Sequence, residues 1–151
     1  MLDIDGVLAD VAHRVRHVQR SPKDWDAFFA GMADDPVLPE GSRLAWELAE
    51  DHHVVYLTGR PARYAEVTRT WLQRHELPAG PVVHRRDGDR RPASIAKAAL
   101  LRAIAARTTV AVAVDDDPAV CVAYRALGLD VVHATWAQHP ALHREQERGQ
   151  T

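Results

Sequence analysis

The sequence has almost nothing that points to export, a membrane or a disulfide-stabilised fold. It contains one cysteine, Cys121, so no intrachain disulfide can form. Cys121 lies in the apolar segment AVCVAYRAL, which favours a buried structural thiol over a nucleophile. No apolar run approaches the roughly 20 residues that span a bilayer, and no basic segment followed by an apolar run stands at the N-terminus. We therefore expect a cytoplasmic protein with no membrane association.

An excess of positive charge is also lacking. The formal net charge is -2 and the sequence pI is about 6.5, so there is no global positive field to hold a long polyanion. Any contact with nucleic acid must then be local. There is no internal repeat and no glycine-rich loop ending in GK[ST], which excludes a P-loop kinase. At 151 residues, with 46% hydrophobic and 26% charged residues, the chain has the composition of one folded globular domain.

Short apolar runs alternate with amphipathic segments along the chain. The continuous runs 54–57 and 110–114 are typical of strands buried on both faces of a parallel sheet. This alternation predicts an α/β fold with a doubly wound, Rossmann-like parallel sheet, helices on both faces and a small helical cap insert at about 10–39. We expect residues 1–137 to form the domain and residues 138–151 a loose polar tail. The other predicted elements are helices over 40–50, 62–75, 94–107 and 118–127, and strands at 82–83 and 129–133.

The cap insert is expected to contain two short helices. One begins in VAHRVRHV, and the second lies in SPKDWDAFF, with Ser21 as its N-cap and Pro22 in its first turn. Trp25, Phe28 and Phe29 would form the apolar face of the second helix. Aromatic residues at such spacing favour packing in a core or lid over a stacking surface for a ligand.

The segment LDIDGVLAD near the N-terminus carries a pair of carboxylates at a spacing that suggests chemistry. In a strand Asp3 and Asp5 point to the same face, and Gly6 lets the backbone leave the strand directly after them. Two such carboxylates repel unless a cation lies between them or one stays protonated; the alternative is a surface turn. Only Met1 and Leu2 precede Asp3, so either the first strand is clipped or the natural chain starts further upstream.

Polar side chains stand at the C-terminal ends of four apolar runs, which is where parallel sheets bind their ligands. Carboxylates at two strand ends suit a hard cation, and hydroxyl, arginine and lysine groups suit a phosphate. In chain order these residues are Asp3 and Asp5; Thr58, Gly59 and Arg60; Arg85 and Arg86; and Asp115, Asp116 and Asp117.

These motifs resemble those of the haloacid dehalogenase (HAD) superfamily of phosphatases. DIDGV resembles the first motif, LTGR the second, Lys97 the third and VAVDDDP the fourth, over residues 2 to about 136. The resemblance implies that Asp3 is the nucleophile that takes the phosphoryl group as an aspartyl-phosphate. It implies that Asp5 protonates the leaving oxygen and later serves as the base for water. Thr58 would hydrogen-bond to the phosphate, and Lys97 would neutralise charge on Asp3 and the transferring group.

The resemblance also implies a Mg²⁺ cofactor. Its ligands would be the Asp3 carboxylate, the Asp5 backbone carbonyl and a carboxylate of Asp115 or Asp116. Asp117 stands where a non-acidic residue is common, so the sequence leaves open which of the three consecutive aspartates reaches the metal. Only two of the 19 basic residues are lysines, yet one of them, Lys97, stands where the motif expects a lysine. A solvated helix lysine is the alternative interpretation.

Within the superfamily the chain is most similar to the phosphatase domain of bacteriophage-type polynucleotide kinase/3′-phosphatases. The segments LTGRP, HRRDGDRRPASIAK and VAVDDDPAV carry this similarity. It implies that Arg14, Arg60 and Arg85, together with Thr58 and Gly59, bind the scissile phosphate and a neighbouring group, which suits a nucleotide end. We interpret Arg86 as surface charge.

The leading hypothesis is therefore a Mg²⁺-dependent phosphomonoesterase that acts on the 3′-phosphate of a nucleic-acid end or a nucleotide, as in nucleic-acid repair. With no P-loop in the sequence, we expect a stand-alone phosphatase or a detached module. One alternative is a HAD phosphatase for another small phosphorylated metabolite, favoured by the acidic net charge. Another is a catalytically weak HAD-like binding module, motivated by the clipped first strand. The sequence leaves open DNA versus RNA, and whether the chain forms a homo-oligomer.

Overall fold

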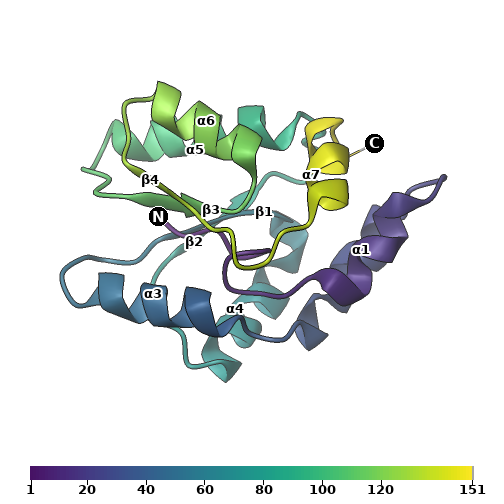
Figure 1. Cartoon of the computed structure of the whole chain (residues 1–151), viewed down its shortest axis with the longest axis horizontal. Coiled ribbons are helices and arrows are strands. Elements are labelled where there is room, and N and C mark those ends of the chain that lie inside the picture. Colours follow the sequence, from purple (N-terminus) through teal and green to yellow (C-terminus); the bar gives the residue numbers. More distant parts are fainter. Residues whose placement is uncertain (151) are drawn as a thin grey trace.

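The computed structural model describes residues 1–150 and contains four short parallel strands between layers of helices (Figure 1). Two parallel pairs form, β1 with β2 and β3 with β4; Tyr56 lies opposite Val82 in the first pair and Ala113 opposite Val131 in the second. The strands are β1 (Tyr56–Pro61), β2 (Val82–Arg85), β3 (Ala113–Asp115) and β4 (Val131–His133).

The N-terminal segment joins the two strand pairs. Leu2 makes parallel bridges to Tyr56 in β1 and to Val114 in β3. The amide of Leu2 donates to the Val55 carbonyl at 2.9 Å, and the amide of Asp3 donates to the Val114 carbonyl at 2.9 Å. The strand expected at the N-terminus is thus reduced to isolated bridges: Leu2 pairs with β1 and β3, whereas Asp5 pairs only with Ala9 in the following turn. The structure confirms an α/β fold with parallel strands, present here as two strand pairs connected through Leu2.

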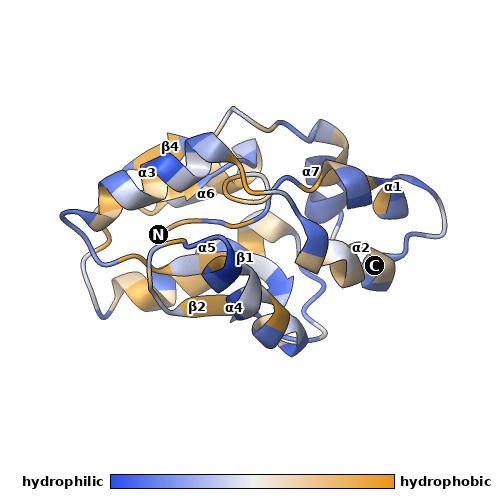
Figure 2. Cartoon of the chain, turned by 90° about the horizontal axis from the view of Figure 1, so that it is seen from below, coloured by the Kyte–Doolittle hydropathy of each residue, from blue (hydrophilic) through white to orange (hydrophobic). Residues whose placement is uncertain are grey.

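Helices lie on both sides of these strands (Figure 1). Helix α5 packs on β1, and α6 packs on β3 and β4, while α3 and α4 lie on the opposite side. In Figure 2, α1 and α7 carry mainly hydrophilic residues. The α-helices are α1 (Ala12–Gln19), α2 (Trp25–Ala30), α3 (Pro39–Ala49), α4 (Ala65–Arg74), α5 (Ala93–Ala105), α6 (Pro118–Ala126) and α7 (Pro140–Glu147); the 3₁₀ helices are η1 (Gly31–Asp34) and η2 (Ala62–Tyr64).

The ends of the helices follow from local capping chemistry. The Asp117 carboxylate accepts from the Ala119 amide at 2.8 Å at the start of α6, with Pro118 in the first turn, as expected for a good N-terminus. The prediction of Ser21 as the N-cap of the second cap helix is wrong. Asp24 fills that position, accepting from the Ala27 amide at 2.8 Å, because a carboxylate three residues before a free helix amide can cap it directly.

The strands end later than their apolar runs suggest. Thr58, Gly59 and Arg60 lie inside β1 rather than after it, and Arg85 and Asp115 are the last residues of β2 and β3. The reason is that the parallel pairing extends past the apolar residues, with an irregularity between Thr58 and Pro61 in the register with β2. The polar residues are nevertheless all found at this C-terminal edge of the strands.

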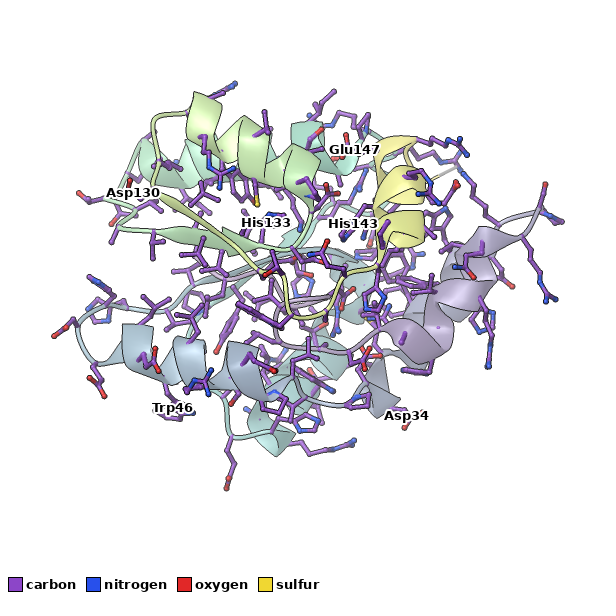
Figure 3. All side chains as sticks on the ribbon, in the orientation of Figure 1. Asp34, Trp46, Asp130, His133, His143 and Glu147 are labelled. Carbon is purple, nitrogen blue, oxygen red and sulfur yellow. The ribbon has the colours of Figure 1, made fainter. Side chains whose placement is uncertain are left out.

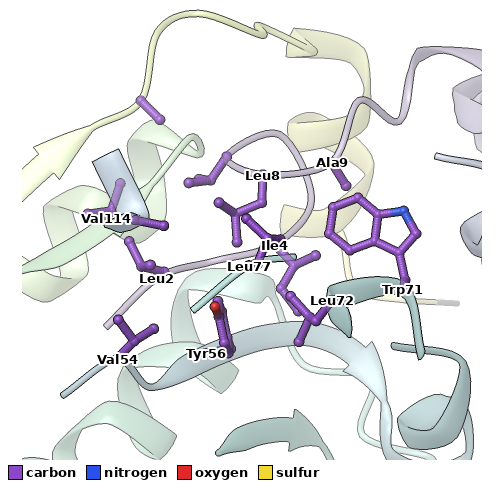
Figure 4. Packing of buried hydrophobic residues seen from close by; sticks show 13 residues of the cluster. Leu2, Ile4, Leu8, Ala9, Val54, Tyr56, Trp71, Leu72, Leu77 and Val114 are labelled. Atoms are coloured by element: carbon purple, nitrogen blue, oxygen red, sulfur yellow. The ribbon is translucent and has the colours of Figure 1, made fainter. Parts of the chain in front are cut away.

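The N-terminal segment is buried in the main core (Figure 4). Leu2, Ile4 and Leu8 pack there with Tyr56 and Trp71, so burial of the apolar neighbours holds the intervening aspartates in place. By contrast, Trp46 is 52% exposed on the outer side of α3 (Figure 3). The neighbouring Ala45 takes the buried position on this helix.

The cap residues form a second core. Phe28 and Phe29 are buried with Val15, as predicted for core or lid packing, and Trp25 packs against this cluster. Leu142 of α7 completes it.

The C-terminal residues differ from the loose tail expected from their polarity. Helix α7 packs against α1 and α5, with Leu142 and His143 buried. Polar contacts fix it: Lys23 pairs with Glu145 at 2.6 Å, and Ser94 donates to Glu147 at 2.7 Å. Within residues 1–150, no helix has both the length and the apolar character needed to cross a bilayer.

Candidate active site

Three buried aspartates meet at the C-terminal edge of the strands. Asp3, Asp115 and Asp116 each present one carboxylate oxygen, and these oxygens all lie within 4.8 Å of one another. Lys97 from α5 reaches the same point and donates to Asp3 Oδ2 at 2.6 Å and to Asp115 Oδ2 at 2.8 Å. The structure thus brings together four of the predicted residues from three distant parts of the sequence.

The electrostatics of this cluster favour an additional cation. Burial raises the pKa of Asp3 to about 7, despite the opposing effect of Lys97, and burial raises the pKa values of Asp115 and Asp116 to about 6. Lys97 contacts only Asp3 and Asp115, so its single ammonium charge does not balance three close carboxylates. Asp3 Oδ1 is also buried without a hydrogen-bond partner in the described residues. Carboxylate oxygens left in this way fit a hard divalent cation held by Asp3, Asp115 and Asp116.

Asp117 does not belong to this oxygen cluster. Its carboxylate caps α6 instead, which separates its structural task from the position of Asp115 and Asp116. Asp5 also contributes no side-chain oxygen to the cluster, and metal binding through its backbone carbonyl stays a prediction.

The environment of Asp116 includes a residue that the sequence analysis missed. His143 Nε2 lies 2.8 Å from Asp116 Oδ2, and Figure 3 shows His143 projecting from α7 toward the strands. Burial opposes the charge on His143, but the Asp116 hydrogen bond prevails and raises the pKa of the imidazole. On the other side, Gly6 has φ 77°, and a Cβ there would overlap the Asp116 carboxylate. Glycine is therefore required at this position on two grounds.

Two arginines converge on Asp5. Arg14 donates to Asp5 Oδ1 at 2.8 Å, and Arg60 donates to the same oxygen through Nε at 2.9 Å and Nη2 at 2.6 Å. All three side chains are buried, and the Arg14 guanidinium also lies over the Phe28 ring at 4.2 Å. The predicted residues Arg14 and Arg60 are therefore side by side at Asp5.

A second carboxylate, Asp35, completes the network and was not identified from the sequence. It accepts from Arg14 Nε at 2.8 Å and Nη2 at 2.7 Å, and from Arg60 Nη2 at 3.0 Å. The Trp71 indole donates to its backbone carbonyl at 2.8 Å. Asp35 lies in the loop DDPVLP, where a carboxylate beside proline resembles any turn residue, so no local signal marks it.

This network sets the ionisation of Asp5. Burial alone would raise its pKa, but Arg14 and Arg60 outweigh burial and lower the pKa of Asp5 to about 2. Burial raises the pKa of Asp35. In this arrangement Asp5 is a carboxylate at neutral pH, so it can donate a proton only after the arginines move away from it.

Thr58 and Gly59 directly precede Arg60 on β1. Thr58 is fully buried, and its hydroxyl accepts from the Arg60 amide at 3.2 Å. A Cβ on Gly59 would be 3.9 Å from Lys97 Cε, so the Gly59 backbone lies beside the end of the Lys97 side chain. The Gly59 carbonyl accepts from the Gln150 side-chain amide at 3.4 Å.

Arg85 is not brought into contact with Arg14 or Arg60. Its Nε donates to the Asp89 carbonyl at 2.8 Å, and its Nη2 donates to the Arg91 carbonyl. These bonds fold the guanidinium back onto the loop after β2. A substrate-binding role for Arg85 therefore stays a prediction, because its hydrogen bonds here are to loop carbonyls.

Comparisons with known proteins were made for the whole chain. The family model described as "Polynucleotide kinase PNKP phosphatase domain" matches residues 1–138. No curated protein sequence matches. Among solved structures, the chain is similar to a chain of "Structure of Pnkp1/Rnl/Hen1 complex". The TM-score is 0.74, the sequence identity is 21%, and the match covers 91% of this chain and 46% of that chain. It is also similar to "Structure of the Pnkp1/Rnl/Hen1 RNA repair complex", with a TM-score of 0.75, 21% identity and coverage of 91% and 42%. The chain thus spans less than half the length of either.

Proposed function

The chain belongs to the family of HAD phosphatase domains of polynucleotide kinase PNKP, and on this premise we propose that it is a Mg²⁺-dependent phosphomonoesterase that removes a 3′-phosphate from a nucleic-acid end. The observation that carries the proposal is the buried meeting of Asp3, Lys97, Asp115 and Asp116 at the strand ends. One of the similar structures is that of an RNA repair complex, which supports action on ends produced by strand breakage. The finer fold prediction, a doubly wound, Rossmann-like parallel sheet with a small helical cap insert, is part of this proposal.

Asp3 is the proposed nucleophile. Lys97 engages Oδ2, which leaves Oδ1 without a partner in residues 1–150 and able to attack phosphorus. The bond from Oδ1 to phosphorus forms as the bond from phosphorus to the 3′ oxygen breaks. Attack of water on phosphorus then breaks the aspartyl-phosphate bond and returns the Asp3 carboxylate.

Asp3, Asp115 and Asp116 would hold Mg²⁺ with the Asp5 backbone carbonyl. When bound, the ion would supply positive charge that offsets the repulsion between the carboxylates and the incoming phosphate. Lys97 provides the chain's own contribution to the same balance, because its ammonium contacts both Asp3 and Asp115.

Asp5 is the proposed acid and base, and the arginine network supports a coupling to substrate. A phosphate dianion competes with Asp5 and Asp35 for Arg14 and Arg60, since guanidinium groups bind phosphate through paired hydrogen bonds. Once these arginines turn to the phosphate, the pKa of Asp5 rises, so the carboxylate takes a proton from solvent and can pass it to the leaving 3′ oxygen. The ionised Asp5 then takes the proton of the attacking water.

The direct test is phosphate release from a 3′-phosphorylated oligonucleotide, a 3′-mononucleotide and a sugar phosphate with Mg²⁺ present. We expect turnover of at least one nucleic substrate, and its absence from both would refute the proposal. Turnover of the sugar phosphate alone would favour the metabolite phosphatase, the alternative that agrees with the net charge of -2. Asp3→Asn should abolish hydrolysis of an aryl phosphate, and an unaffected rate would rule out the proposed nucleophile.

A further inference from the structure

A cavity of about 380 Å³ adjoins the candidate site on the side of the cap. It lies between α2, the residues that follow Arg60 and the loop after β2, with Pro61 in its wall. Gln150 also lines it, and the same side chain hydrogen-bonds to the Gly59 carbonyl. The cavity therefore opens directly beside the segment of β1 that contacts Lys97 and Asp5, and its volume is in the range of small-ligand sites.

One wall of this cavity is aromatic. Trp25 and Phe29 both line it, and their rings are stacked with centroids 6.0 Å apart and an interplanar angle of 27°. Phe28 packs edge-on against both rings and holds them in place. Trp25 is half-buried, so it offers a rigid apolar surface whose position is fixed by the cap core.

Four basic side chains also line the cavity. Lys23 and Arg63 line the cavity and are already paired with Glu145 and Asp26, whereas Arg86 and Arg90 are exposed and have no ion pair within residues 1–150. Arg86, which the sequence analysis interprets as surface charge, is thus exposed and also lines a cavity.

The three carboxylates in the cavity wall are committed elsewhere. Asp24 caps α2, Asp26 pairs with Arg63, and Asp89 holds Arg91 with an Nη2 to Oδ2 distance of 2.7 Å. The lining of the cavity therefore includes two uncommitted guanidinium groups and an aromatic ring. A sugar phosphate would satisfy the cations and leave the aromatic wall unused, whereas a nucleotide has a phosphate for one wall and a base for the other.

Resting on the function proposed above, we propose that this cavity binds the nucleotide on the 5′ side of the scissile phosphate in a single-stranded end. Its base lies against Trp25, and its phosphodiester is bound by Arg86 and Arg90. The chain then gains affinity for a strand from a local basic surface, which its net charge of -2 could not provide globally.

The test measures both turnover and binding with the full chain. In Arg86→Gln/Arg90→Gln and in Trp25→Leu, kcat/KM for a 3′-phosphorylated pentanucleotide should fall about tenfold, mainly through KM. Hydrolysis of p-nitrophenyl phosphate, which has no adjoining nucleotide, should stay unchanged. The matched control is Arg102→Gln/Arg107→Gln, which removes two exposed arginines at the far end of α5 and should behave as wild type in both assays.

Fluorescence anisotropy with a 3′-hydroxyl pentanucleotide tests the cavity independently of hydrolysis. The Arg86/Arg90 variant should bind about tenfold more weakly and show a shallower dependence on salt. Unchanged affinity in the cavity variants, or an equal loss in the control variant, would overturn the proposed subsite. Binding that depends on the cavity residues without any hydrolysis would instead uphold the subsite and refute the proposed phosphatase activity.

Discussion

At the scale of single residues, the candidate site contains two groups of buried carboxylates that differ in the number of cationic partners. Lys97 contacts Asp3 and Asp115, and His143 is the partner of the third buried aspartate, Asp116. Asp5 and Asp35, by contrast, share two arginines. The first group therefore carries an excess of negative charge and the second is balanced. The pKa values differ accordingly: burial raises the pKa of Asp3 to about 7, whereas Arg14 and Arg60 outweigh burial and lower the pKa of Asp5 to about 2.

Lys97→Met should destabilise the protein when no divalent ion is present. The change leaves Asp3 and Asp115 buried without their ammonium, and breaking such a pair costs about 3–5 kcal/mol. Urea unfolding in EDTA measures the loss. Lys23→Met removes the other lysine, whose ion pair with Glu145 is more exposed, and should cost far less.

Asp5 should make stability depend on pH in the acidic range. Its pKa is lowered to about 2 in the folded protein by Arg14 and Arg60, against burial. A lowered pKa means that its contribution is present above the ordinary carboxyl pKa and is lost as the pH falls toward about 2. Wild type should thus lose about 2 kcal/mol more than Asp5→Asn between about pH 4 and about pH 2. Equal losses, measured by urea unfolding at both pH values, would contradict the ion pairing described for Asp5.

At the scale of elements, α7 is the least expected part of the molecule. The family match ends at residue 138, and α7 begins at Pro140, yet its His143 contacts Asp116 of the candidate metal cluster. Hydrogen bonds to the carboxylates that hold a metal orient them and tune their affinity. A helix outside the family match therefore contributes to the conformation of a central residue.

His143→Asn should weaken Mg²⁺ binding about 10–100-fold, as loss of such an orienting partner generally does. Isothermal titration calorimetry measures this affinity without any substrate. His52→Asn, at an exposed position before β1, is the control and should bind as wild type. An unchanged affinity in His143→Asn would show that Asp116 needs no support from α7.

At the scale of the whole molecule, the buried carboxylates link metal binding to folding. Mg²⁺ that binds the native cluster but not the unfolded chain raises stability with ion concentration. The melting temperature should rise on addition of Mg²⁺ and return with EDTA. Asp115→Asn should abolish most of this increase, whereas Asp117→Asn, which alters only the cap of α6, should retain it.

Much of this arrangement is predictable from the sequence, because parallel strands carry their polar residues to one common edge. Asp3, Asp115 and Asp116 are found together for that reason, and Lys97 reaches them from helix α5. What the sequence does not indicate are contacts made by residues with ordinary local surroundings. Asp35 resembles a loop aspartate and His143 a tail histidine, and only the packing of η1 and α7 brings them to Arg14 and Asp116.

The boundaries of the strands are also less predictable from the sequence than the order of the strands along the chain. The runs 54–57 and 110–114 are apolar throughout, but pairing in β1 and β3 begins only at Tyr56 and Ala113. Apolar periodicity reports burial, whereas a strand boundary depends on which partner backbone is within hydrogen-bonding distance. The cap insert shows the same limit, since its aromatic core was predictable and its Asp24 cap was not.

Finally, the single cysteine makes α7 accessible to site-specific labelling. Cys121 is buried, its thiol donates to the Asp115 carbonyl at 3.4 Å, and burial raises the pKa of the thiol to about 12. It is therefore inert toward maleimide reagents at neutral pH. A cysteine introduced at the exposed Arg148, which follows α7, would be the sole reactive thiol. A fluorophore there would report movements of α7 in the otherwise native protein.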